Sequence, residues 1–228
     1  MSGTSSLSWH VLLVLLVVDA VLIGLAVLYT RGVLTDPRFW VSKERGFGEM
    51  WQYAKYIASA LILFRGARRG YGPTAVLWGV LFVGLFCEDA FTIHEQLGWR
   101  LAPRLHLPPF GSMQPHQLGE IVVAAVEAGG FLLLLGVLLR TATAASRRLS
   151  AVLLVGLATL GLFGVGVDAI HSVVASPQST LDAVLGIAED GGEMIAASLL
   201  LWIAWLWREP RAVVITAATS LDSTRAAH

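Results

Sequence analysis

The sequence predicts an all-α integral membrane protein, a bundle of about six transmembrane helices. Its 228 residues are 56% hydrophobic and 14% charged, and the mean hydropathy is +0.70. Apolar windows of about twenty residues recur along the chain, and each is long enough to cross a hydrocarbon core of ~30 Å. The single cysteine, Cys87, excludes an intrachain disulfide and any metal or cluster site built from several cysteines.

The apolar windows indicate one transmembrane domain over residues 1–207. The first window follows MSGTSSLSWH, which has no basic segment and precedes no cleavage site, so we expect a retained helix and not a signal peptide. Residues 208–228 lack a periodic apolar face, and we expect them to form a disordered cytoplasmic tail. The expected spans are at about residues 9–29, 47–64, 74–95, 118–139, 151–174 and 181–207.

The arginines predict the orientation. They gather between the second and third spans, between the fourth and fifth, and after the sixth, whereas the connection between the fifth and sixth spans has none. The positive-inside rule places these arginine-rich segments and both termini in the cytoplasm. Arginine exceeds lysine, and alanine, glycine and leucine are abundant, a bias typical of GC-rich bacterial genomes. We therefore expect the plasma membrane of a bacterium.

The fourth span carries the first sign of a functional site. His116 at its entrance and Glu120 and Glu127 inside it fall on one narrow helical face. A carboxylate that faces lipid costs roughly 2–3 kcal/mol on insertion scales. We therefore expect this face to be turned toward protein and to find partners there.

The second and third spans carry further polar residues. Glu49 and Lys55 share the polar sector of the second span, which is amphipathic. The third span ends in the letters CEDAFTIHEQ, where Glu88 and Glu95 share a face of the expected helix and His94 points away from it. These residues are candidate partners for the acidic face of the fourth span.

The last two spans complete the set. Asp168 and His171 have the i, i+3 spacing of ligand pairs in helical bundles, and Glu189 and Glu193 lie one turn apart on the sixth span. The proline-rich segment 98–115 is expected to be an ordered, lid-like segment at the membrane interface.

With this topology, all these side chains lie in the outer half of the bilayer. Carboxylates that close together cannot all stay ionised beside one lysine, so either several are protonated or cations are bound. Carboxylate and imidazole ligands suit a divalent metal, Zn or Fe/Mn. The expected metal ligands are Glu88, Asp89, His116, Glu120, Glu127, Asp168, His171, Glu189 and Glu193, and the expected supporting residues are Glu49, Lys55, His94, Glu95 and Asp190.

Three functions fit this cluster. The first is a membrane metalloenzyme, a hydrolase or a di-metal oxidase acting on a lipid-like substrate, with Glu127 or Glu189 as general base. The second is a divalent-cation or proton transporter or channel that uses the same carboxylates. The third is a non-catalytic membrane subunit. The inner halves of the third, fourth and sixth spans are almost entirely apolar, which favours a dead-end pocket, and hence an enzyme, over a conduit.

The expected partners are the lipid bilayer and a lipid-like small molecule or metal ion, with no nucleic acid. The sequence leaves the substrate, the oligomeric state and the choice between transport and catalysis open.

Overall fold

The computed structural model describes residues 3–175 and 179–208. Of these residues, 84% are helical, and no strand occurs among them apart from an isolated bridge between Phe110 and Met113. The all-α prediction is therefore confirmed. The expected disordered tail falls almost entirely on residues 209–228, which lie outside the described residues.

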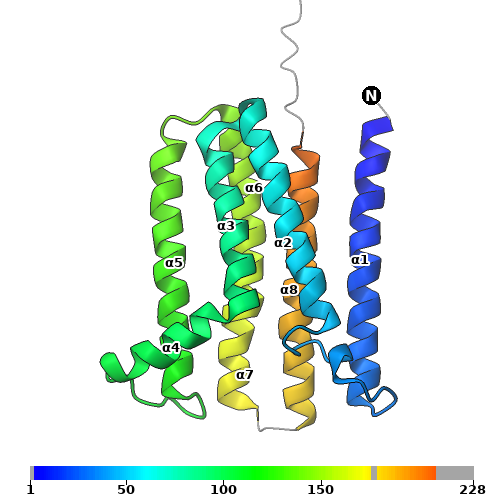
Figure 1. The fold of residues 1–228 in the computed structure, drawn as a ribbon, viewed down its shortest axis with the longest axis vertical. Helices are drawn as coiled ribbons and strands as arrows, with labels where there is room; N and C mark the ends of the chain where they lie inside the picture. The colour runs from blue at the N-terminus through cyan, green and yellow to red at the C-terminus, as the bar shows by residue number, and fades with distance from the viewer. Residues whose placement is uncertain (1–2, 176–178, 209–228) are drawn as a thin grey trace, which may run out of the picture.

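Long helices run side by side in an up-and-down arrangement, and one shorter helix, α4, lies across them at one end (Figure 1). α6 continues through a wide π-helical stretch, η3, into α7, so these three form a single rod. The elements are α1 (Gly3–Thr30), η1 (Pro37–Phe39), α2 (Phe47–Gly66), η2 (Ala67–Tyr71), α3 (Gly72–Phe91), α4 (Ile93–Arg104), α5 (Pro115–Leu139), α6 (Ala144–Gly161), η3 (Leu162–Val167), α7 (Asp168–Val174) and α8 (Thr180–Leu206).

Four helical stretches in the described part of the chain are long and apolar enough to cross a membrane, which marks the chain as a membrane protein. They are Leu7–Thr30, Phe47–Phe91, Pro115–Leu139 and Ala144–Val174. The second stretch contains both α2 and α3. The chain reverses between these two helices at Gly70, whose φ of 119° lies in a region that glycine adopts readily and other residues rarely do.

One end of the bundle is a closely packed apolar core formed by α2, α3, α5, α6 and α8. Trp78 of α3 is fully buried there. Its ring packs edge-on against Phe131 of α5 at 4.9 Å between centroids, and its indole nitrogen donates to Ser150 Oγ of α6 at 3.0 Å. Leu153 and Leu200 fill the space between α6 and α8 without exposed surface.

The three arginine-rich segments gather at the same end. Ser146 Oγ donates to the carbonyl oxygen of Tyr71 at 2.9 Å, which ties the start of α6 to the turn between α2 and α3. Tyr71 also packs edge-on against Trp207 after α8. The turn between α2 and α3, the start of α6 and the end of α8 therefore lie together.

Helix α1 is held to α2 and α8 by a buried ion pair. The Lys55 ammonium lies 3.0 Å from Asp19 Oδ1, and both side chains are only 1% exposed. The ammonium also donates to the Met194 carbonyl oxygen at 2.6 Å, while Trp51 and Ser198 donate to the Asp19 carboxylate. Lys55 was expected beside the acidic cluster. Its ammonium instead binds Asp19, Ser198 and the Met194 carbonyl oxygen, so among the described residues its ion pair and hydrogen bonds do not go to the acids of that cluster.

We expect that Lys55→Met lowers the free energy of unfolding by roughly 3–5 kcal/mol, because it leaves the Asp19 charge buried without its partner. The double variant Asp19→Asn/Lys55→Met removes both charges and should recover most of that loss. Unfolding in mixed micelles, followed by tryptophan fluorescence, measures both. Equal losses in the single and double variants would show that the ion pair does not hold α1.

Candidate functional site

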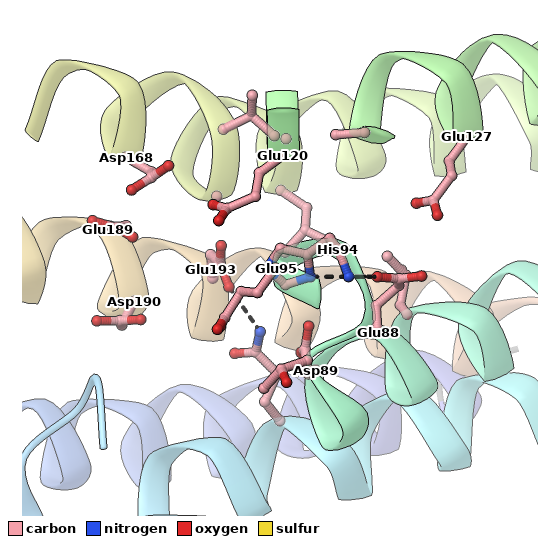
Figure 2. A pocket seen from close by; sticks show the side chains of 18 of the residues that line it. Glu88, Asp89, His94, Glu95, Glu120, Glu127, Asp168, Glu189, Asp190 and Glu193 are labelled. Carbon is pink, nitrogen blue, oxygen red and sulfur yellow. Dashed lines mark hydrogen bonds and ion pairs between the residues drawn. The ribbon is translucent and has the colours of Figure 1, made fainter. Parts of the chain in front are cut away.

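One cavity of about 830 Å³ lies at the opposite end of the bundle from the apolar core and extends inward toward it (Figure 2). Residues from α2, α3, α4, α5, α6, η3, α7, α8 and the loop before α2 line it. Among the described lining residues, eleven are acidic and a single one, Lys43, is a lysine. The acidic residues are Glu44, Glu49, Glu88, Asp89, Glu95, Glu120, Glu127, Asp168, Glu189, Asp190 and Glu193.

Most of the residues expected to form the site surround this cavity. His94 and His116 line it together with all the acids that the sequence pointed to. Lys55 and His171 are the two exceptions, since neither is a lining residue. The structure thus brings the residues together, and their roles as ligands or bases stay predictions.

A helix break at Thr92 forms one wall of the cavity. The expected span 74–95 is too long, because α3 ends at Phe91 and Thr92 adopts a left-handed conformation with φ of 46°. Such a φ is rare for a β-branched residue, and its cost must be offset by nearby contacts. Glu88 Oε2 accepts a hydrogen bond from the His94 backbone N–H at 2.8 Å, and Gln96 Nε2 donates to the Phe91 carbonyl oxygen at 2.8 Å. These bonds satisfy backbone groups left open by the break.

The break turns His94 into the cavity. The sequence placed this side chain away from the acidic face, which assumed one continuous helix. Instead, His94 Nδ1 lies 3.3 Å from Glu88 Oε2, and Figure 2 shows the imidazole among the carboxylates. It also interacts electrostatically with Glu120, Glu127 and Asp168. His94 is therefore the histidine best placed to act together with these acids.

Two glycines set the crossing of α4 over α5. A Cβ on Gly119 would lie 2.9 Å from Gly98 Cα, and a Cβ on Gly98 would lie 2.7 Å from the His116 carbonyl oxygen, so the backbones touch. Beside this contact, Trp99 stacks on His116 with the rings 3.9 Å apart and 8° from parallel. Residues 98–104 of the segment expected as an interfacial lid therefore belong to α4 and anchor the acidic face of α5, whereas residues 105–114 form a non-helical connection to α5.

Small residues also bring η3 against α8. A Cβ on Gly164 would collide with the Glu193 carboxylate, and a Cβ on Gly192 would collide with the Phe163 ring. Glu193 accepts a hydrogen bond from Gln52 Nε2 at 3.0 Å. The carboxylate of Glu193 thus lies against bare backbone on one side and an amide donor on the other.

His171 was expected as a metal ligand on the same face as Asp168. Its Nδ1 lies 2.9 Å from Glu189 Oε2 and its Nε2 lies 2.9 Å from Asp182 Oδ1, so both ring nitrogens are engaged. This bridge joins α7 to the first half of α8 beside the cavity. In this conformation His171 positions Glu189, which is a lining residue, and does not itself reach the cavity.

Some lining residues escaped the sequence analysis. Ser42 hydrogen-bonds to Asp190, and Glu44 lines the cavity from the same loop. A loop has no periodicity, so nothing in the sequence marked these two. Gln52 and Tyr56 share the polar face of α2 with Glu49, and the 2.9 Å hydrogen bond between them continues the polar wall. Their helical spacing from Glu49 places both in the polar sector expected for the second span, although they were not among the expected site residues.

The inner part of the cavity is apolar. Its lining residues there belong to α3, α5 and α6 and carry no charge; they are Leu81, Leu85, Ala128, Phe131, Leu132, Leu154, Leu157, Ala158, Leu160 and Gly161. The cavity therefore has two chemically distinct ends, one rich in carboxylates and one of hydrocarbon side chains.

The carboxylate end offers oxygen and imidazole donors. Within residues 3–175 and 179–208, no three His, Cys, Asp or Glu side chains are arranged so that they could hold a metal ion. Glu88 and His94 form a carboxylate–imidazole pair, and Figure 2 shows Glu120 and Glu127 projecting from α5 on either side of this pair in that view. The donor types are those that bind divalent cations, although the described side chains do not enclose one in this arrangement.

A family model described as Domain of unknown function (DUF8692) matches residues 8–208. The chain belongs to this family. The matched range contains every lining residue of the cavity. Neither the curated proteins nor the solved structures contain a significant match.

We expect that Glu88→Ala frays the start of α4, because it removes the acceptor for the His94 amide. Loss of such a cap costs about 1 kcal/mol, so the first amides of α4 should exchange about fivefold faster. Glu88→Gln keeps an acceptor oxygen and should largely retain protection. Hydrogen–deuterium exchange over residues 93–104 tests this, and equal protection in Glu88→Ala and the wild type would contradict the role of Glu88.

Proposed function

We propose that the protein is a membrane-embedded metal-binding protein and that it acts as a metalloenzyme within the outer half of the bilayer. The observation that carries this proposal is the gathering of eleven acidic side chains around one cavity with a single lysine at its edge, counted over the described lining residues. Positive charge must balance these carboxylates, or they must be protonated, and divalent cations supply the most charge in the least volume.

The proposed topology has six membrane spans with both termini in the cytoplasm. The spans would be α1, α2, α3, α5, the rod from α6 to α7, and α8 (Figure 1). The arginine-rich segments meet at one end, and the positive-inside rule assigns that end to the cytoplasm. The cavity mouth then faces outward. The compositional bias supports a bacterial plasma membrane as the location.

Glu88, Glu120, Glu127 and His94 would form the centre of the metal site. They come from three helices and line the same cavity. Asp89, His116, Asp168, Glu189 and Glu193 remain candidate ligands farther along its wall. A bound Zn would supply Lewis-acid activation of an ester or amide, and bound Fe or Mn would supply redox chemistry. Glu127 and Glu189 are the candidate general bases, with Glu189 held by His171.

The packing of the inner end supports an enzyme over a transporter. A conduit needs a polar lining across the membrane, whereas Trp78, Leu153 and Leu200 fill the path below the cavity. The deeper polar residues Asp19, Lys55 and Ser198 bind one another and close a separate network. A dead-end pocket suits a reaction at its closed end.

We expect purified protein to contain one or two equivalents of Zn, Fe or Mn. Glu120→Gln and Glu127→Gln keep the side-chain size and remove one anionic ligand each, so each should lower the metal content severalfold without preventing membrane insertion. Plasma mass spectrometry of protein purified in mild detergent measures the metal.

Asp36→Asn is the matched control. Asp36 is an acid paired with Arg38 in the loop before α2 and lies outside the cavity, so its replacement should leave the metal content unchanged. Unaltered metal stoichiometry in both glutamine variants would refute their ligand roles. A wild-type protein that holds no metal after gentle purification would favour protonated carboxylates.

A further inference from the structure

We propose that the cavity binds an amphiphile with a hydrocarbon chain and a cationic amine head group, which enters from the bilayer between α5 and α6. This inference deepens the proposed function, on which it rests, by naming the substrate class of the same cavity. The chain would lie at the apolar end and the amine at the carboxylate end.

The apolar end has the length and the lining that a hydrocarbon chain requires. Along the rod from α6 to α7, Asp168 and Leu154 are fourteen residues apart, which corresponds to about 20 Å of helix. Leu157, Ala158 and Gly161 line the wall between them, and Phe131 and Leu132 line the opposite wall on α5. A site for a small polar substrate or a bare ion would have no use for this apolar extension.

The gap between α5 and α6 gives the chain a path to the lipid. α5 packs closely against α4 at one end and contacts α3 through Phe131 at the other, but it is not closely packed against α6. Figure 1 shows α5 at the edge of the bundle. Leu132, which is 50% exposed, and Ala158, also exposed, line the cavity from the two sides of this gap. A lipid chain could therefore enter the cavity laterally from the bilayer, between α5 and α6, while its head group stays near the membrane surface.

The charge of the cavity selects the head group. Two divalent ions and Lys43 would bring five positive charges against eleven acidic side chains, so an anionic head would add to the repulsion. A protonated amine has the complementary charge and three donors for carboxylate oxygens. The balance of charge therefore points to a long-chain amine and away from a fatty acid.

Photolabelling of the protein in phosphatidylcholine nanodiscs tests the inference. The probe is a long-chain alkylamine with a diazirine at the end of its chain, and the control probe is the fatty acid of the same length with the same diazirine. We expect the amine to label the segments around Leu132, Leu154 and Leu157 about tenfold more than the fatty acid does.

Two tryptophan variants of α6 provide the matched comparison. Ala158→Trp fills the gap from a lining position and should lower labelling by the amine severalfold. Val155→Trp places the same ring one turn away, where Val155 is 68% exposed and does not line the cavity, and should leave labelling unchanged. Each variant is also analysed for metal, which should be retained in both.

Several outcomes would overturn the inference. Equal labelling by the two probes would refute the cationic head, and labelling spread evenly over lipid-facing α1 and α5 would refute the chain site. Metal binding without specific labelling would overturn this inference and leave the proposed function standing. Specific labelling of metal-free protein, unaffected by added metal, would support the chain site and refute the metal-dependent function.

Discussion

The cost of placing a carboxylate in hydrocarbon determines the arrangement of this bundle. Acidic side chains that cannot face lipid lie toward one end of α2, α3, α5, α8 and the rod from α6 to α7, so these ends turn toward one another. Once together, like charges resist close approach, and the space between them stays open. At the other end, where the same helices carry Leu153, Trp78 and Leu200, they pack into a continuous core. The cavity and the core are thus two results of one distribution of charge along the helices.

Local backbone features adapt the helices to this arrangement. Gly164 lets the Glu193 carboxylate lie against η3, where any side chain would push α8 away. The left-handed Thr92 redirects the chain so that α4 crosses the bundle, and Glu88 binds the backbone that the turn leaves open. Glu88 therefore lines the cavity and also stabilises the helix break that forms one of its walls, so the chemistry of the site is coupled to its shape.

The helices and the acidic face of α5 could be predicted from the sequence because both follow from periodicity and hydropathy. The break at Thr92 could not, since no glycine or proline marks it and the bonds that stabilise it come from Glu88 and Gln96. For the same reason His94 was assigned to the wrong face. A helical projection gave the polar sector of α2 correctly, but it could not say that Lys55 faces α1 while Gln52 faces the cavity. The direction in which each of these side chains faces depends on which helices pack against α2, and the sequence of α2 alone does not show this.

Helix α4 works as a strut. It is about 18 Å long, and it joins the end of α3 to the start of α5 through backbone contact at Gly98 and Gly119. Ionised carboxylates on facing helices repel one another and load α5 outward, and the Gly98–Gly119 contact holds α5 at one end while the Trp78–Phe131 contact holds it toward the other. Neutralising the carboxylates removes the load without altering any of these attachments. A cation bound among the carboxylates would therefore relieve the load on α5, which borders the gap through which an amphiphile would pass.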